Sequence, residues 1–379
     1  MLIHFLLVCQ MGVSLGATVQ GVGDFMRELS IDGRRIAEDE PCYVVAELGH
    51  NHGGDVKTAC AMIASAAQAG TSAVKLQKRD LTRCYTYALL SQPYENEHSY
   101  GKTYGEHPRA LEFNFGQYVS CRAMAQGHHV SFFATAFDEA SADFLMRLDV
   151  PAIKIASGDL LNTPLLRYVA QFGKPMILST GGGTFEDIDR AVDTILPLNK
   201  DLALLHCTAA YPVRDFAELN LQVIPQMIFR YPACVIGWSG HDSGIAMSVL
   251  AYSLGARIIE KHFTLNRAMK GTDHAFSLEP VGLTKLVRDL GRAQQALGDG
   301  QKQRYHSEDA PLMKMEKSLV AARDLPQGHV LEFSDLVAKS PAGGLSPYLI
   351  DSVMGFALTC AIRQDEPVRH EHLTVAHVA

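Results

Sequence analysis

Short apolar runs alternate with longer amphipathic stretches over most of the chain. Eight such runs occur, at residues 42–48, 72–77, 130–135, 151–157, 175–180, 202–207, 234–239 and 256–263. Continuous apolar runs are typical of strands buried on both faces of a parallel sheet. Eight such strands with helices between them predict an α/β fold, a (β/α)8 TIM barrel. A doubly wound open sheet is the alternative, but no glycine-rich dinucleotide fingerprint follows the first strand.

Capping residues mark where several of the predicted helices begin. Asp55 and Asp138 each precede an amphipathic stretch, and Thr184 is followed by Asp187 at the spacing of a capping box. Gly70 is expected to end the first of these helices. These signals lie between the apolar runs, as a barrel of alternating strands and helices requires.

A different pattern follows the last long helical stretch, so the barrel domain is expected to span residues 26–298. Residues 299–315 are polar and are predicted to be a linker. Residues 316–379 carry short alternating strands with PQG and PAGG turns, which predict a small β-rich second domain. A domain of this size buries little apolar surface, so we expect it to need a neighbouring surface.

The first 25 residues resemble a secretory signal only weakly, because no Lys or Arg precedes their apolar part. The stretch is also too short to span a bilayer. We therefore expect residues 1–25 to be a non-essential extension, with ordered structure beginning near Met26.

The composition of the chain bears on its partners and on its cellular compartment. A net charge of −7 gives no electrostatic reason to expect nucleic acid or an anionic membrane as a partner. The eight cysteines are scattered and form no CxxC motif. Free cysteines in apolar segments are typical of a reducing compartment, so we expect a cytoplasmic protein.

Polar side chains gather where the predicted strands end, which is where TIM barrels hold their active sites. In AVKLQ, Lys75 and Gln77 alternate with apolar neighbours and are predicted to face the barrel interior. The other strand ends carry Glu47, Thr135, Lys154, Ser157, Ser179, Ser239, His241, Glu260 and His262. Burying so many polar groups is costly unless they pair or bind a ligand.

Two interior lysines, Lys75 and Lys154, lie among Ser and Thr hydroxyls and favour a site for phosphate and carboxylate groups. Two other interpretations stay open. The lysines could be structural ion-pair partners of Glu47 and Glu260. One of them could instead form a Schiff base, because a desolvated lysine is a nucleophile.

His241 and His262 end the last two predicted strands, and Glu260 is two residues from His262. Each histidine alone is expected to be a hydrogen-bonded core residue. Together with Glu260 they favour a two-imidazole site for a divalent metal, which suits Mn²⁺ or a neighbouring transition metal. The His50–His52 segment, HNH, is a competing metal cluster, but loops of this kind after a strand more often form a turn.

The motifs AELGHNHGGD, AVKLQ, FFATAFD, IKIASGDL, LSTGGG, LHCTAAYP, SGHDSG and EKHFTL occur in the order seen in one known family. From about residue 40 to its end, the chain resembles the sialic acid synthases and related nonulosonic acid synthases. The resemblance implies that the second domain is an antifreeze-like (SAF) domain. It also implies a homodimer in which each small domain caps the partner's barrel.

The same resemblance implies the reaction: phosphoenolpyruvate condenses with an N-acyl amino sugar such as N-acetylmannosamine, and phosphate is released. By position, Glu47 and Glu260 would handle protons and water, and His241 and His262 would bind the metal, Mn²⁺ first, with Mg²⁺ or Co²⁺ as alternatives. The groups implied to hold phosphoenolpyruvate are Lys75, Thr135, Lys154, Ser157, Ser179 and Ser239. Those implied to contact the sugar are Gln77, Tyr211 and Asp273.

Two positions depart from the family pattern. Ala209 stands where the family motif CTN has its asparagine, and Ser340 stands where the pattern KRP has an arginine. Both changes fall on the sugar side of the site, so they put N-acetylmannosamine itself in doubt as the acceptor.

Two other functions are consistent with the residues. A lysine Schiff-base aldolase of TIM-barrel type would need no metal, and borohydride with substrate would trap its lysine. A non-catalytic carbohydrate-binding protein would release no phosphate from phosphoenolpyruvate.

Overall fold

The computed structural model describes residues 27–375, so the predicted extension at residues 1–25 lies outside the described residues. The chain forms two compact units, one ending at Gly298 and the other beginning at Asp299. Within residues 27–375, none of the helices has both the length and the apolar surface needed to cross a bilayer.

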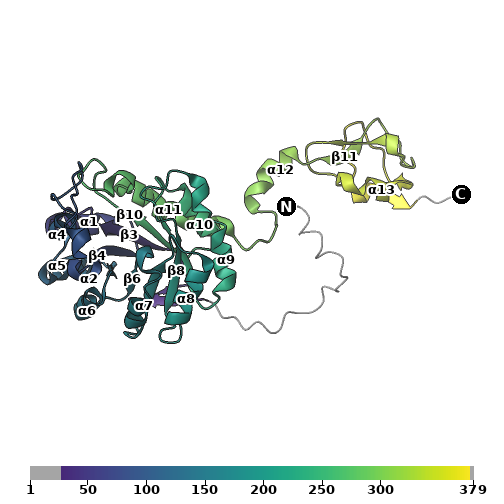
Figure 1. Cartoon of the computed structure of the whole chain (residues 1–379). Coiled ribbons are helices and arrows are strands. Elements are labelled where there is room, and N and C mark those ends of the chain that lie inside the picture. Colours follow the sequence, from purple (N-terminus) through teal and green to yellow (C-terminus); the bar gives the residue numbers. More distant parts are fainter. Residues whose placement is uncertain (1–26, 376–379) are drawn as a thin grey trace. The chain divides into compact units, whose positions relative to one another are not determined.

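The first unit is a closed barrel of eight strands in the order β10-β3-β4-β5-β6-β7-β8-β9, which confirms the (β/α)8 prediction (Figure 1). Every neighbouring pair is parallel, and β10 pairs with β3 to close the ring. The strands are β3 Tyr43–Gly49, β4 Ala73–Lys78, β5 Ser131–Ala136, β6 Ile153–Ile155, β7 Met176–Ser179, β8 Leu202–Cys207, β9 Val235–Gly240 and β10 Ile258–His262. The bounds of each strand differ by at most a few residues from those of the apolar run that predicted it.

Helices surround the barrel on its outer side (Figure 1). The main ones are α1 Val56–Gln68, α5 Phe115–Gly127, α6 Glu139–Leu148, α7 Thr163–Ala170, α8 Phe185–Ile195, α9 Val223–Arg230, α10 Ala246–Ser253 and α11 Pro280–Leu297. The capping predictions are confirmed. Asp55 accepts from the backbone of Lys57 and Thr58. Asp138 caps α6, and Thr184 with Asp187 forms a reciprocal capping box on α8.

Two features of the barrel unit were not predicted. A hairpin of β1 Leu29–Ile31 and β2 Arg34–Ile36 precedes the barrel, turning through Asp32 and Gly33 at positive φ. The second is the long connection from β4 to α5, which contains α2 Leu81–Cys84, α3 Tyr87–Leu90 and α4 Glu106–Leu111. Short 3₁₀ turns also follow strands of the barrel, at η1 Ser157–Asp159, η2 Phe216–Leu219 and η3 His274–Phe276.

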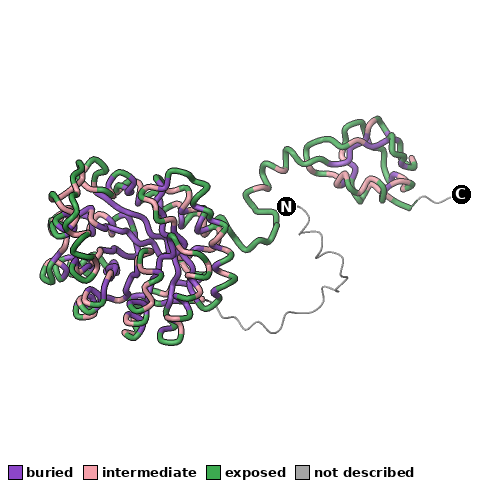
Figure 2. Tube along the Cα trace, viewed as in Figure 1, coloured by how far each residue is buried: buried purple, intermediate pink, exposed green. Residues whose placement is uncertain are grey.

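The core of the barrel unit lies in and around the strands, which are buried along their whole length except at the end of β4, where Gln77 and Lys78 are half-buried (Figure 2). Apolar side chains from the strands pack against the inner faces of the helices. On α1, for example, Ala59, Met62, Ile63 and Ala66 are fully buried. These positions have the i, i+3, i+4, i+7 spacing of one face of an amphipathic helix.

The second unit has its own small core around Leu319, Leu331, Leu345, Leu358 and Val368. Its strands pair as β11 Ser318–Ala321 with β12 Leu336–Lys339, and β13 Phe356–Leu358 with β14 Leu373–Val375. Its helical elements are η5 Phe333–Asp335, η6 Pro347–Leu349, α13 Ile350–Val353 and η7 His370–His372. The segment predicted to be a linker is partly helical, with η4 His306–Glu308 and α12 Asp309–Met315.

The buried carboxylate of Asp335 connects three segments of the second unit by hydrogen bonds. Asp335 is fully buried and accepts from Arg323 at 2.6 Å, from His329 at 2.7 Å and from the backbone N–H of Glu332 at 2.9 Å. Burial alone raises the pKa of Asp335, but the hydrogen bonds from His329, Glu332 and Arg323 outweigh it, so this pKa lies below its ordinary value.

Asp335→Asn should destabilise the second unit by about 1–3 kcal/mol, because it leaves buried donors without their charged acceptor. Peptide-resolved hydrogen exchange of the full chain should show faster exchange in residues 318–339. The exposed Asp351→Asn serves as the control and should leave exchange unchanged. The Asp335 contribution exists above the unfolded pKa of about 3.9 and disappears as pH falls through the lower folded value. Equal exchange in both variants would contradict this assignment.

Candidate active site

A cavity of about 530 Å³ opens at the carboxyl ends of the barrel strands. Its size is typical of a small-molecule site, and its position is that of the active site in TIM barrels. Every side chain that the sequence singled out for catalysis, substrate or metal lines it: Glu47, Lys75, Gln77, Thr135, Lys154, Ser157, Ser179, Tyr211, Ser239, His241, Glu260, His262 and Asp273.

Strand register brings these side chains together. On one side of the barrel, Lys75 is opposite Glu47, and Thr135 is opposite both Gln77 and Lys154. At the closing strands, Glu260 is opposite Ser239 and His262 is opposite Glu47. Successive strand residues point to opposite faces, so residues in register on neighbouring strands share the barrel interior.

Lys75 forms the centre of the buried charges. Its Nζ lies 2.7 Å from Glu47 Oε2 and 3.8 Å from Glu260 Oε1, and it donates to Thr135 Oγ1 at 2.9 Å. Burial lowers the pKa of Lys75, but Glu260 and Glu47 outweigh it, so the lysine stays charged. The ion pair between Lys75 and Glu47 that the sequence allowed is therefore present. Lys75 also lines the cavity while it is paired.

The two carboxylates of this cluster have opposite tendencies. Burial raises the pKa of Glu47, with Lys75 opposing it. Burial also acts to raise the pKa of Glu260, but Lys75, Lys154 and the hydrogen bond from Ser239 outweigh it and lower the value. Two neighbouring carboxyls whose pKa values move apart can divide acid–base work, one carrying a proton while the other stays ionised.

Lys154 differs from Lys75 because no carboxylate lies within ion-pair distance of it among residues 27–375. It is 2% exposed, and its Nζ donates to Ser179 Oγ at 2.5 Å and to the Ile155 carbonyl at 2.9 Å. Burial lowers the pKa of Lys154, with Glu260 opposing. A buried ammonium without a paired carboxylate, beside a cavity rimmed by hydroxyls, is suited to an anionic ligand.

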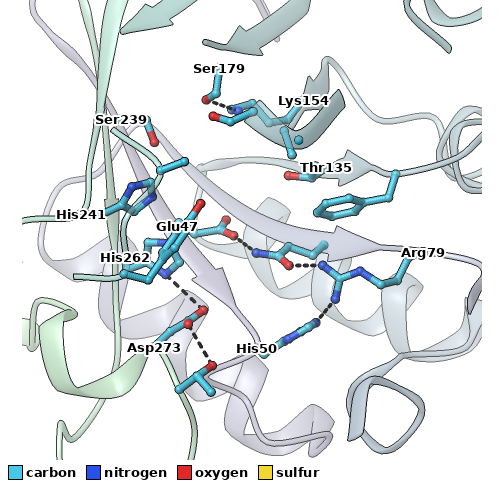
Figure 3. Close-up of a pocket in the computed structure, with 18 of the residues that line it drawn as sticks. Glu47, His50, Arg79, Thr135, Lys154, Ser179, Ser239, His241, His262 and Asp273 are labelled. Carbon is cyan, nitrogen blue, oxygen red and sulfur yellow. Dashed lines mark hydrogen bonds and ion pairs between the residues drawn. The ribbon is translucent and has the colours of Figure 1, made fainter. Parts of the chain in front are cut away.

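His241 and His262 face each other with ring centroids 5.3 Å apart (Figure 3). His241 Nδ1 donates to the Thr208 carbonyl at 3.0 Å, which leaves the Nε2 lone pair free. Burial lowers the pKa of His241 to about 3 and also lowers the pKa of His262, so both rings are neutral. Neutral imidazole is the metal-binding form, and a backbone carbonyl on the second nitrogen is a common support for a ligand histidine.

These residues fit a divalent metal held by few protein ligands. His262 Nδ1 and Glu260 Oε2 are buried without hydrogen-bond partners, and Asp273 Oδ2 lies 3.6 Å from His262 Nδ1. Within the described part of the chain, no group of three or more His, Cys, Asp or Glu side chains is arranged around a common metal position. The protein ligands would then be the two imidazoles, with water and substrate oxygens in the open positions.

The competing HNH cluster does not converge on one point. His50 Nε2 accepts from Arg79 at 2.6 Å, and His52 Nδ1 accepts from the Gly54 N–H at 3.1 Å. Asn51 donates to the Phe263 carbonyl and to Ser277, both at 2.9 Å. The three side chains therefore stabilise the loop and its neighbours, as the turn interpretation predicted.

The sugar-side residues of the prediction lie in the same cavity. Gln77 Nε2 donates to Glu47 Oε1 at 2.7 Å, so the amide contacts the buried carboxylate directly. The ring of Tyr211 lies 4.2 Å from that of His241, and Tyr211 is 55% exposed at the mouth. Ala209 also lines the cavity, so the departure from the family motif does fall on its wall.

Sequence reasoning missed one wall of the cavity. Six further lining residues come from the connection from β4 to α5: Arg79, Tyr85, Tyr94, Tyr104, His107 and Pro108. His50, which the sequence suggested only as part of the HNH cluster, lines the cavity as well. The connection has no simple hydrophobic period, so its path could not be predicted. The only local signal was the basic pair Lys78 and Arg79, directly after Lys75 and Gln77.

Comparison with known proteins agrees with this architecture. The chain matches the NeuB family over residues 62–302 and the SAF domain over residues 316–374. The mouse protein N-acetylneuraminate-9-phosphate synthase is 38% identical over 340 residues, which cover 89% of this chain and 94% of the relative. The N,N'-diacetyllegionaminic acid synthase of Campylobacter jejuni is 33% identical over 86% of this chain and 98% of the relative. The predicted order of a barrel followed by a SAF domain is confirmed.

A solved structure shows the same similarity. The N-acetylneuraminic acid (sialic acid) synthetase from Leptospira borgpetersenii, in complex with citrate, superposes with a TM-score of 0.65 and is 32% identical. The match covers 76% of this chain and 95% of that one.

Lys75→Met should destabilise the barrel by about 3–5 kcal/mol, because it leaves two buried carboxylates without the cation between them. Urea unfolding can be followed by the fluorescence of Trp238, the single tryptophan and a buried residue of β9. Adding Glu47→Gln to Lys75→Met should recover part of the loss. The exposed Lys57→Met on α1 is the control and should change stability by no more than about 0.5 kcal/mol. If Lys75→Met unfolds like that control, the ion cluster does not stabilise the barrel.

Proposed function

The chain belongs to the NeuB family, and on that basis we propose that it is a nonulosonic (sialic) acid synthase. In this reaction phosphoenolpyruvate condenses with the aldehyde of an N-acyl amino sugar, and phosphate is released. A new carbon–carbon bond forms between C3 of phosphoenolpyruvate and C1 of the sugar. Water adds at C2, and the C2 substituent leaves as inorganic phosphate.

The observation that carries the proposal is the unpaired, buried Lys154 next to Lys75. The ammonium of Lys154 donates hydrogen bonds to Ser179 and to the Ile155 carbonyl, and the hydroxyls of Thr135, Ser157 and Ser239 line the same cavity. Phosphoenolpyruvate carries both a carboxylate and a phosphate. Two lysines surrounded by hydroxyl donors supply the matching charge and hydrogen bonds.

His241 and His262 are proposed to hold a divalent metal, Mn²⁺ in the first place and Mg²⁺ or Co²⁺ as alternatives. Two buried neutral imidazoles facing each other support this assignment. The chemistry that such a cation supplies is Lewis-acid polarisation of the sugar aldehyde. The protein's own contribution is proximity, since both substrates would be held in one cavity with the reacting carbons adjacent.

Glu47 and Glu260 are proposed to manage protons and water. Glu47, whose pKa is raised by burial, is the group suited to carry a proton. Glu260, held ionised by Lys75 and Lys154, is suited to orient the water that attacks C2. The hydrogen bond from Ser239 to Glu260, at 3.0 Å, fixes the direction of that carboxylate.

The acceptor is expected to contact Gln77, Tyr211 and Asp273. The curated relatives include synthases named for a phosphorylated product and for an unphosphorylated one. We therefore expect the acceptor of this chain to depend on its own side chains. Ala209 lines the cavity, and a role of Ser340 toward the sugar is implied by the family pattern alone.

A homodimer in which the small domain of one subunit caps the barrel of its partner, and a cytoplasmic location, are proposed from the family resemblance and the cysteine pattern. Mass photometry of the purified chain tests the first, and fractionation of the source cells tests the second. A monomer at micromolar concentration would contradict the dimer.

A Schiff-base aldolase is the second candidate, because burial lowers the pKa of Lys154 and so increases its nucleophilic form. Borohydride reduction in the presence of substrate, followed by mass spectrometry, would detect an adduct on Lys154 or Lys75. Release of phosphate from phosphoenolpyruvate would exclude the third candidate, a carbohydrate-binding protein without activity.

His241→Ala and His262→Ala should each lower turnover by about 100-fold or more, because Lewis-acid polarisation is worth several kcal/mol. Calorimetric titration with Mn²⁺ should show weaker binding in both variants, which gives a readout independent of activity. His128→Ala, an exposed position at the end of α5, is the control and should bind Mn²⁺ like the wild type.

Wild-type turnover in either variant would overturn the metal assignment. Full activity in EDTA together with a borohydride adduct would favour the aldolase instead.

Ala209→Asn combined with Ser340→Arg should raise kcat/KM for N-acetylmannosamine, because the changes restore two polar groups of the family pattern. Each added hydrogen bond of about 1 kcal/mol corresponds to about a fivefold gain. Steady-state phosphate release with saturating phosphoenolpyruvate measures this, and Ala209→Ser gives a smaller polar control. An unchanged kcat/KM would mean that other residues already compensate.

A further inference from the structure

Arg79 is a buried cation on the wall of the cavity. Neither the alternation of residues along the strands nor the family motifs indicated it as a site residue. It follows β4 directly and is 7% exposed. Its guanidinium donates to His50 Nε2 at 2.6 Å and to Gln77 Oε1 at 2.5 Å (Figure 3). Its other face lies over the ring of Phe137, 4.2 Å from the centroid.

All of these partners are neutral. Gln77 is an amide, Phe137 is a hydrocarbon ring, and His50 accepts from Arg79 and therefore lacks a proton on Nε2. Burial, followed by the charge of Arg79, holds the pKa of His50 well below its ordinary value. No carboxylate among residues 27–375 lies within ion-pair distance of the Arg79 guanidinium, and its buried Nε has no hydrogen-bond partner.

The carboxylate next to the Arg79 backbone is paired with the adjacent Lys78 instead. Glu112 lies 2.7 Å from Lys78 Nζ and also accepts from the backbone N–H of Arg79, but it does not pair with the guanidinium. Taking an arginine out of water without a counter-charge costs several kcal/mol. The unpaired guanidinium on a cavity wall is therefore suited to an anion brought by a ligand, and its flat fork fits the oxygens of a phosphate.

The position of Arg79 indicates which part of the ligand would reach it. In Figure 3, Arg79 and His50 lie across the cavity from Ser179 and from His241 and His262. Gln77 lies between the two ends, joined to Glu47 on one side and to Arg79 on the other. A sugar whose aldehyde is next to the two histidines would extend past Gln77, and its far end would meet Arg79.

Other donors line the same end of the cavity. His107 Nδ1 accepts from the Tyr100 N–H at 3.1 Å, so its proton is on Nε2. Tyr85, Tyr94 and Tyr104 also line this end. These neutral groups can donate hydrogen bonds without competing for the charge of Arg79.

We propose that Arg79 binds a phosphate ester at the far end of the acceptor sugar, so that the acceptor is an N-acyl amino sugar 6-phosphate. This inference rests on the proposed synthase function. The three carbons of phosphoenolpyruvate become C1 to C3 of the product, so a phosphate on C6 of the acceptor becomes a phosphate on C9. Arg79 is then a specificity residue, and the geometry that supports it is independent of the metal and phosphoenolpyruvate groups.

The test compares kcat/KM for N-acetylmannosamine 6-phosphate and for N-acetylmannosamine in three variants. The wild type should prefer the phosphorylated sugar. In Arg79→Gln, the ratio of the two kcat/KM values should fall about 10- to 100-fold, mainly through KM for the phosphorylated sugar. Arg79→Lys should keep part of the ratio, because it keeps the charge and loses the fork. The exposed Arg83→Gln on α2 is the charge-matched control and should keep the wild-type ratio.

Two outcomes would overturn the inference while leaving the synthase function intact. If Arg79→Gln lowers both kcat/KM values equally, Arg79 only positions Gln77. If it raises KM for phosphoenolpyruvate and leaves the ratio unchanged, Arg79 serves the other substrate.

The absence of turnover with either sugar would instead count against the proposed function. Calorimetric titration with N-acetylmannosamine 6-phosphate, in EDTA and saturating phosphoenolpyruvate, then decides the inference. Binding by the wild type that is lost in Arg79→Gln and kept in Arg83→Gln supports it, and equal or absent binding overturns it. Trp238 fluorescence and circular dichroism check that each variant is folded.

Discussion

The active-site end of this barrel depends on one arrangement of buried charge, the pairing of Lys75 with Glu47 at 2.7 Å beside Glu260 at 3.8 Å. Two carboxylates that face one interior repel each other unless a cation lies between them. Strand register provides that cation, because β4 is parallel to β3 with Lys75 opposite Glu47. Glu47, held by Lys75, in turn accepts a hydrogen bond from the amide of Gln77 and so orients that side chain. Lys75 therefore forms a structural ion pair and lines the cavity at the same time, so the two interpretations of Lys75 do not exclude each other.

Much of this architecture was readable from the sequence because it rests on local rules. The eight strands are continuous apolar runs, and the helix starts at Asp55, Asp138 and Thr184 follow from side chains that satisfy free backbone N–H groups. Most of the site residues could be listed for a related reason, whereas Tyr211 and Asp273 came from the family resemblance alone. Polar residues at the carboxyl ends of parallel strands must converge once the sheet closes into a barrel.

What the sequence could not provide was set by contacts between distant segments. The hairpin at Asp32 and Gly33 carried a recognisable turn signal, but its two three-residue strands are too short to show a period. The choice between an ion pair and an anion site at Lys75 and Lys154 needed distances, and these differ between the two lysines. Arg79 was missed because the connection that follows it has no regular pattern, and its burial depends on Phe137 and His50.

The cavity contains three cations, and they differ in whether a carboxylate of the protein pairs with them. Lys75 is neutralised by the protein itself, whereas Lys154 and Arg79 have no paired carboxylate among residues 27–375. The protein therefore supplies unpaired positive charge at two places on the wall of one cavity. Two anionic groups that bind there would each meet a cation. Buried charges are screened little by salt, so such a cavity would discriminate between substrates by charge even at physiological ionic strength. On this argument, specificity for the acceptor is an electrostatic property of the barrel wall as much as a matter of hydrogen bonds to the sugar ring.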